Sequence, residues 1–431
     1  MAESAALAAD NSCAHVEPSR PHAAATAAPV PAASFHTLLE TIDPSTITYT
    51  SQDLENPKPE VSHPHTQRIL DQAAALLKDG QVVGMPTETV YGLASNALDS
   101  VAAQRIFKAK NRPQDNPLIV HVSSLQMLRS ILKDNTIPEV YTDLIRTYWP
   151  GPLTLLFPRS SLIPNEITCG QPMVAVRFPS HPITRALIST TGLPLAAPSA
   201  NSSGKPSPTL ASHVMDDLQG KIPMIIDGGQ CSFGIESTVV DGLRVPPAIL
   251  RPGGVTYEQI RQVKGMETVQ VYKKHFTDAA MEQAPTTPGM KYRHYSPEAE
   301  VVLVEYVGGA GSGAGSSQAT TGQYSAITKE IDRLKQEGKT RFGILRTSFD
   351  SALQSNSSLQ ADGVIEFPLG QRSKPEDVAR ELFRGLRFLD SQHVDCIFVE
   401  GISEDDEGLA VMNRLRKAAS RTISSDTTEF L

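Results

Sequence analysis

The stretch Lys108-Ala-Lys-Asn-Arg-Pro-Gln-Asp-Asn-Pro-Leu-Ile-Val-His121 contains the end of a helical pattern, a break at proline and a short apolar strand. Cations stand at positions 108, 110 and 112, at the end of the predicted helix. The proline at position 113 ends the helix, and residues 118–122 then form an apolar run of strand length. A helix that leads directly into a buried strand indicates an α/β fold.

A second segment, Pro198-Ser-Ala-Asn201, is a polar turn that follows the apolar strand 195–197. It places a hydroxyl and an amide two residues apart. Cations together with hydroxyl and amide donors at strand ends suit the binding of a polyphosphate by an open α/β sheet. The chain has no Gly-x-x-x-x-Gly-Lys-Ser/Thr loop, so a nucleotide would have to bind by another route.

Strand-like and helix-like patterns alternate along most of the chain, which predicts a mixed, twisted sheet covered by helices. From about residue 300 a second α/β pattern begins. The predicted domains are a disordered tail (1–58), a catalytic α/β domain (59–266), a linker (267–297) and a smaller α/β domain (298–431). The predicted helices are 64–78, 100–109, 124–133, 138–148, 182–190, 209–219, 256–264, 323–336, 374–390 and 407–418.

Composition excludes several classes of protein. The chain has 431 residues, 40% of them hydrophobic and 20% charged, which is enough for a substantial core. The net charge of -8 argues against a protein whose whole surface binds nucleic acid. A local basic cleft is still compatible with this charge. The four cysteines lie far apart, which predicts reduced thiols and no zinc cluster. No apolar run is long enough for a membrane helix.

The first 34 residues are rich in alanine and proline and cannot bury enough apolar surface to order themselves. A mitochondrial transit peptide would carry several arginines and few acids. This segment has Arg20 alone, against Glu3, Asp10 and Glu17. We therefore favour a disordered tail over a targeting signal and expect a cytoplasmic protein, with a minor mitochondrial fraction left open.

Residues 283–297 are rich in proline but also carry two tyrosines and Lys291, Arg293 and His294. A passive spacer would consist of glycine, serine or charged residues. The composition therefore predicts a lid that closes over a site and excludes water.

Single polar residues at strand ends are weak evidence. Arg177 is equally well explained as a surface residue or as a ligand for carboxylate or phosphate. His121 alone would more often be a satisfied core residue. Together, however, many polar residues follow predicted strands, where open sheets build their sites. They are Thr89, Arg112, Asn116, His121, Arg177, Ser199, Ser237 and Arg251.

Several ordered motifs resemble the YrdC-like family of L-threonylcarbamoyladenylate synthases. They are Pro-Thr-Glu-Thr-Val-Tyr-Gly-Leu (86–93), Lys-Asn-Arg-Pro-x-x-Asn-Pro-Leu (110–118), Trp-Pro-Gly-Pro-Leu-Thr (149–154), Val-Ala-Val-Arg (174–177), Ala-Ala-Pro-Ser-Ala-Asn (196–201), Glu-Ser-Thr (236–238) and Leu-Arg-Pro-Gly (250–253). The segments 288–297 and 410–418 resemble its two-domain form, found in archaea, many bacteria and fungi, and a fungal origin is expected. The resemblance implies a YrdC-like open mixed sheet and a smaller Rossmann-like C-terminal domain.

The family resemblance implies a nucleotidyltransferase that makes threonylcarbamoyl-AMP and pyrophosphate from L-threonine, bicarbonate and ATP, with Mg²⁺ accompanying ATP. The product serves the N6-threonylcarbamoyladenosine modification of tRNAs that read ANN codons. It would pass to the tRNA threonylcarbamoyl transferase complex. A monomer without membrane contact is expected, and weak RNA binding stays open.

The resemblance also implies roles for individual residues. Lys110 and Arg112 would be catalytic. L-Threonine would lie among Thr89, His121, Arg177, Ala197 and Ser237. ATP would be held by Arg112, Asn116, Met173, Ser199, Asn201, Ser207, Arg251 and Tyr292, with Met173 contributing a backbone contact.

Two rival hypotheses are open at this stage. One is an RNA- or ribosome-binding module without chemistry, which the net charge of -8 disfavours. The other is a carbamoyl-transfer enzyme of hydrogenase maturation, which carries a similar domain. That protein type also has paired zinc-binding Cys-x-x-Cys motifs, and this chain has none.

Overall fold

The computed structural model describes residues 35–49, 53–278, 287, 294–305, 317–347 and 363–424. The first part of the chain forms an eleven-stranded mixed sheet with parallel and antiparallel neighbours. In spatial order its strands are β1 (Leu38–Thr41), β10 (Met224–Asp227), β4 (Val83–Met85), β5 (Gly92–Asn96), β9 (Leu195–Ala196), β6 (Ile119–His121), β8 (Met173–Arg177), β7 (Leu153–Pro158), β11 (Thr238–Asp241), β12 (Ala248–Arg251) and β13 (Gln270–Val271). The predicted α/β class is confirmed.

Helices pack on this sheet through two apolar cores. One core joins α1 (Pro64–Lys78) and α6 (Pro182–Thr191) to β4, and α1 has the bounds predicted from its apolar spacing. The larger core contains residues of most other helices. These helices are α2 (Ser100–Lys110), α3 (Leu125–Ile131), α4 (Thr142–Tyr148), α5 (Asn165–Thr168), α7 (Ala211–Leu218) and α8 (Tyr257–Arg261).

Both ends of the first domain extend beyond their predicted limits. Residues 35–49, which lie within the predicted tail, contain β1 and β2 (Ile47–Tyr49). β1 pairs in parallel with β10, and β2 pairs with β3 (Pro59–Val61). At the other end, β13 pairs with β12, although it lies within the predicted linker. These strands are short and lie at sheet edges, so their sequence pattern is too brief to identify them.

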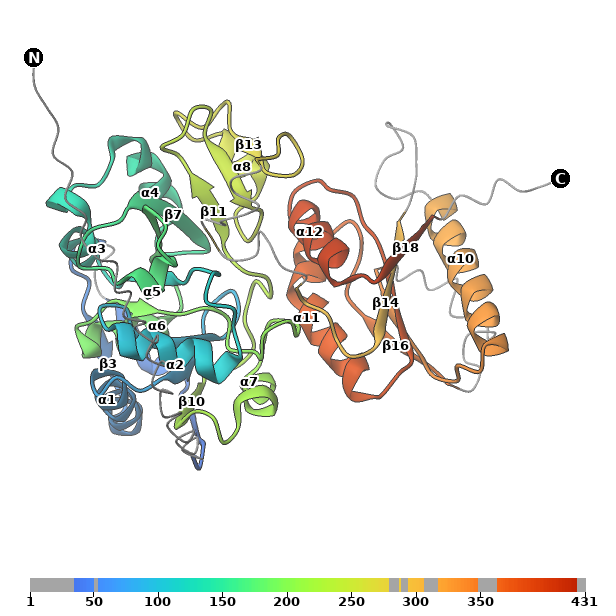
Figure 1. Cartoon of the computed structure of the whole chain (residues 1–431), viewed down its shortest axis with the longest axis horizontal. Helices are drawn as coiled ribbons and strands as arrows, with labels where there is room; N and C mark the ends of the chain where they lie inside the picture. The colour runs from blue at the N-terminus through green and yellow to red at the C-terminus, as the bar shows by residue number, and fades with distance from the viewer. Residues whose placement is uncertain are drawn as a thin grey trace, which may run out of the picture. The chain divides into compact units, whose positions relative to one another are not determined.

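The second domain is a five-stranded parallel sheet with helices on both faces. Its strands, in spatial order, are β16 (Val364–Pro368), β15 (Phe342–Arg346), β17 (Cys396–Glu400), β14 (Glu300–Glu305) and β18 (Arg421–Ser424). Side chains of β14 alternate: Val301 and Leu303 face α11 (Pro375–Ser391) and α12 (Gly408–Ala418), whereas Val302 and Val304 face α10 (Ser317–Gln336). Figure 1 shows α11 and α12 on one side of this sheet and α10 on the other.

Contacts also join the two domains. Arg387 on α11 lies 2.7 Å from Asp217 on α7, and Tyr295 of the linker packs its ring 5.0 Å from that of Phe383 on α11. Within the described parts of the chain, no helix is long and apolar enough to span a membrane.

Candidate active site

The ends of several strands of the first sheet meet around a small cavity of about 60 Å³. Three arginines line it, together with hydroxyl, amide and imidazole groups. The lining residues are Thr87, Thr89, Val90, Gly92, Arg112, Ile119, His121, Arg177, Ala197, Pro198, Ser199, Asn201, Ser207, Glu236, Ser237, Arg251, His294 and Tyr295. We call this cavity the arginine pocket.

Arg177, at the end of β8, is held rigidly and is only 4% exposed. Its Nη1 donates to Thr89 Oγ1 at 2.8 Å and its Nε donates to the carbonyl of Gly151. Nη2 lies 2.8 Å from Glu88 Oε1 but is not aligned for a hydrogen bond. Burial opposes ionisation of Glu88, yet Arg177 and the amide of Ser180 hold its pKa below the usual range. Arg177 is thus a fixed cation with a donor to spare.

His121 ends β6 beside Arg177 and stays neutral. Its Nδ1 lies 3.2 Å from the carbonyl oxygen of Ile119, to which it donates when it carries the ring proton. Burial and then the charge of Arg177 lower the pKa of His121 to about 3. At neutral pH this ring can orient a substrate by hydrogen bonding, but it is too weak a base to take a proton from an amine.

Arg112 reaches the pocket because α2 ends sharply. Asn111 caps the helix in a left-handed conformation, with φ of 51°, and Pro113 prevents the helix from continuing. The Nε and Nη2 of Arg112 donate to the carbonyls of Asn116 and Pro117. Its Nη1 makes no hydrogen bond with the described residues, so it is free to contact an anion.

Arg251, at the end of β12, is held in the same way, and its Nη1 makes no hydrogen bond with the described residues. Its Nε and Nη2 donate to the carbonyl of Ser237, at 3.2 and 3.0 Å. Nη2 also lies 3.3 Å from Ser237 Oγ, which in turn is 2.7 Å from Thr154 Oγ1. Burial lowers the pKa of Arg251, but Glu236 opposes the shift and an arginine remains charged.

Lys110 has a different position from its neighbour Arg112. It is 1% exposed and does not line the pocket. Its Nζ donates to the carbonyls of Ser199 and Asn201, at 2.5 Å each, and approaches Asn201 Oδ1 at 3.4 Å. Burial first, and then Arg112, place its pKa well below the usual range. Lys110 therefore fastens the turn that carries Ser199 and Asn201.

Comparison with known proteins shows which family this chain resembles. A family model described as "Telomere recombination", for Sua5, YciO and YrdC, matches residues 75–253. A second, described as "Threonylcarbamoyl-AMP synthase, C-terminal domain", matches residues 255–420. A threonylcarbamoyl-AMP synthase of Schizosaccharomyces pombe is 43% identical over 90% of this chain and 98% of its own length. That of Pyrococcus abyssi is 45% identical over 81% of this chain and 94% of its own length.

The chain belongs to the threonylcarbamoyl-AMP synthase family. A solved structure agrees: P. abyssi Sua5 complexed with L-threonine has a TM-score of 0.73 and 40% identity, and the match covers 90% of this chain and 99% of that chain. The YrdC-like fold of the first domain and the two-domain form are therefore shown, as the motifs predicted.

Most residues that the motifs assigned to threonylcarbamoyl-AMP synthesis lie together in the arginine pocket. Asn116 and Met173 are not among its lining residues, and their roles stay predictions, as does the catalytic role of Lys110. Tyr292 lies outside the described residues. Those that line the pocket are Thr89, Arg112, His121, Arg177, Ala197, Ser199, Asn201, Ser207, Ser237 and Arg251.

Sequence reasoning missed the two carboxylates of the site, Glu88 and Glu236. Both stand inside the quoted motifs, each beside a hydroxyl residue that was selected. Glu236 Oε1 accepts from Ser207 Oγ at 2.6 Å, and burial, which alone would raise its pKa, is outweighed by Arg414 and Arg251, which lower it to about 2. A carboxylate next to a motif hydroxyl is the signal that could have identified them.

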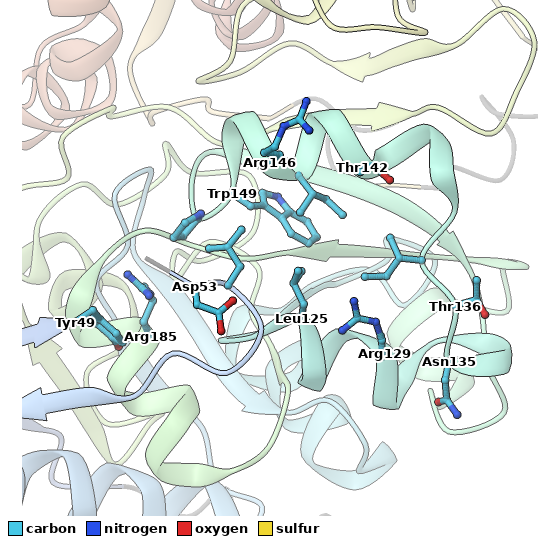
Figure 2. A pocket seen from close by; sticks show the side chains of 14 residues that line it. Tyr49, Asp53, Leu125, Arg129, Asn135, Thr136, Thr142, Arg146, Trp149 and Arg185 are labelled. Carbon is cyan, nitrogen blue, oxygen red and sulfur yellow. The ribbon is translucent and has the colours of Figure 1, made fainter. Parts of the chain in front are cut away.

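A larger cavity of about 960 Å³ lies elsewhere in the first domain and contains none of the predicted site residues (Figure 2). Three arginines line it, but two are paired with acids. Arg129 pairs with Glu55, and Arg146 lies 2.5 Å from Asp143. Arg185 stacks over Tyr49 at 3.6 Å. Its size alone does not make it the site, because the polar residues predicted from the motifs converge in the arginine pocket.

Proposed function

We propose that this chain is a nucleotidyltransferase that joins L-threonine, bicarbonate and ATP into threonylcarbamoyl-AMP and pyrophosphate, in the arginine pocket. The observation that carries the proposal is the set of three buried arginines, Arg112, Arg177 and Arg251, that line one cavity. They face one cavity in a chain of the threonylcarbamoyl-AMP synthase family. A carboxylate and a triphosphate are the anions that such a site suits.

The reaction needs little acid–base help from the protein. Bicarbonate loses hydroxide to give carbon dioxide, the threonine nitrogen bonds to its carbon, and the amine proton joins the hydroxide as water, which leaves a carbamate. A carbamate oxygen then bonds to the α-phosphorus of ATP, and the bond to the β-phosphate oxygen breaks to release pyrophosphate. Because the carbamate is already an anion, the demand is alignment of two anions and stabilisation of charge. The neutral His121 is consistent with that demand.

We propose that the two substrates share the pocket. Arg177, with Thr89 and His121 beside it, would hold the threonine carboxylate and side chain. Arg112 and Arg251 would hold the phosphates, with the Ser199–Asn201 turn and Ser207 around the nucleotide. Ser237 would also contact threonine, since its hydroxyl lies 2.7 Å from that of Thr154, the strand partner of Arg177, and 3.3 Å from Arg251 Nη2.

Mg²⁺ would arrive with ATP. The described residues include no cluster of three His, Cys, Asp or Glu side chains that could hold it as a resident ion. Mg²⁺ commonly keeps water and phosphate oxygens as ligands and uses few protein groups. When bound it would neutralise phosphate charge.

Substrate entry requires the pocket to widen, because cavities that hold ligands of this size measure roughly 300–1,000 Å³. His294 and Tyr295, from the predicted lid, are part of the present lining. We propose that they move aside when ATP enters. Lys291, Tyr292 and Arg293 of the same segment lie outside the described residues.

The product would be passed to the tRNA threonylcarbamoyl transferase complex for the modification of tRNAs that read ANN codons. A mixed anhydride hydrolyses readily, so rapid transfer or shielding from water is favourable. We further propose that the chain acts as a cytoplasmic monomer and that any contact with RNA is weak, in keeping with its negative net charge.

The choice of amino acid tests this assignment. Pyrophosphate release should be fastest with L-threonine, slower with L-serine and slowest with L-valine. Serine keeps the hydroxyl and loses one methyl group, worth about 1 kcal/mol or roughly fivefold. Valine leaves the partners of the hydroxyl buried and unpaired, which costs more. Release that valine supports better than serine, or that needs no amino acid, would contradict the assignment.

A further inference from the structure

Arg414 on α12 is the most deeply buried cation at the contact between the two domains, with 0% exposure. All three of its guanidinium nitrogens have partners. Nε and Nη2 each lie 3.1 Å from Glu236 Oε2, and Nη1 donates to the carbonyls of Pro252 and, at 3.4 Å, of Ala410. Two of these three partners belong to the first domain.

Both first-domain partners of Arg414 are joined directly to the arginine pocket. Glu236 precedes Ser237 in the chain, and its other oxygen accepts from Ser207 Oγ at 2.6 Å. Pro252 follows Arg251, whose guanidinium donates to the carbonyl of Ser237. A single side chain of the second domain therefore holds both strand ends that carry Ser237 and Arg251.

We propose that Arg414 is a positioning residue for the synthesis of threonylcarbamoyl-AMP, and that the second domain contributes it to complete the active site. The proposal rests on the function proposed above. Arg414 would pair with the carboxylate of Glu236. The neighbouring Arg251 would then remain available to bind the phosphates of ATP.

Charge balance supports this role. A buried carboxylate requires a cation, and when its partner is removed it recruits the nearest alternative. Arg251 is the alternative we name, because its guanidinium donates to the carbonyl of Ser237, the residue next to Glu236, and its charge also lowers the pKa of Glu236. Without Arg414, Arg251 would turn toward Glu236, and the phosphates would lose one of their two arginines. A displacement of this kind, even of about 1 Å, costs roughly a hundredfold in rate.

Two single variants and their combination test the proposal. Arg414→Gln should lower kcat/KM for ATP by about tenfold to a hundredfold, with a smaller effect on KM for threonine. Glu236→Gln removes the charge that Arg414 balances. If Arg414 acts through Glu236, the double variant should be no more than about threefold worse than the poorer single variant.

Arg416→Gln is the matched control. Arg416 lies on the same helix, loses the same charge, is 46% exposed on its side chain, and pairs with Glu305 and Glu404 instead of the first domain. Its kinetic constants should stay within about twofold of the unsubstituted enzyme. If Arg414→Gln does not fold, Arg414→Lys can replace it in the kinetic comparison with Arg416→Gln. The lysine keeps the charge but not the planar guanidinium.

The outcomes separate this proposal from the function on which it rests. If the unsubstituted chain makes no threonylcarbamoyl-AMP, the proposed function fails. If it does, but the folded Arg414 variant has normal kinetic constants and only a lower melting temperature, Arg414 is merely structural and the inference is overturned. The inference would also be overturned if the double variant of Arg414 and Glu236 lost activity by the product of the two single losses.

Discussion

Arg112→Ala should slow pyrophosphate release by about thirty- to a thousandfold, which corresponds to roughly 2–4 kcal/mol of lost transition-state stabilisation. Arg112 is buried at the end of α2, and its Nη1 has no hydrogen bond with the described residues. We assign that donor to the phosphates of ATP. Steady-state kinetics with saturating threonine, together with nucleotide binding by calorimetry, would measure the loss.

Lys108→Ala is the matched control for Arg112→Ala. Lys108 lies in the last turn of the same helix but is exposed, so its replacement removes an equal charge away from the pocket. Its rate should remain near normal. Arg112→Lys keeps the charge but cannot hold two carbonyls and a phosphate together. Near-normal turnover by Arg112→Ala would show that this arginine does not bind the phosphates.

Arg177→Lys should raise KM for threonine by about a hundredfold while KM for ATP changes little. The lysine keeps a cation near Glu88, so the buried carboxylate stays balanced. What is lost is the planar group that contacts Thr89, Gly151 and the substrate carboxylate together. Initial rates at varied threonine and fixed ATP would separate the two constants.

Arg185→Lys is the control for Arg177→Lys. Arg185 is a partly buried arginine of the same domain, but it stacks on Tyr49 in the larger cavity of Figure 2. Its replacement should leave both Michaelis constants unchanged. A normal KM for threonine in Arg177→Lys, or a raised KM for threonine in Arg185→Lys, would show that threonine does not bind in the arginine pocket.

The sequence predicted the fold well wherever its patterns were local and long. The helix at 64–78 has its predicted bounds because apolar residues recur at helical spacing and proline and glycine flank it. The sequence also predicted which types of residue line the pocket. Arg112, Arg177 and Arg251 each follow a helix or end a strand, and such ends meet at one edge of an open sheet.

The remainder depends on contacts between distant parts of the chain, which no local pattern records. Lys110 stands two residues from Arg112, yet it binds the carbonyls of Ser199 and Asn201 and does not line the pocket. Arg414 pairs with Glu236, 178 residues away in the sequence. The sequence shows that Lys110 and Arg414 are cations, but only the folded structure shows their hydrogen-bond partners.

The most direct test of the account is to supply the purified protein with ATP, Mg²⁺, L-threonine and ¹⁴C-bicarbonate and to separate the nucleotide products. We predict a labelled product that contains threonine and AMP, formed together with an equal amount of pyrophosphate and absent when threonine is omitted. Pyrophosphate released without label in the nucleotide product, or label incorporated without threonine, would contradict it.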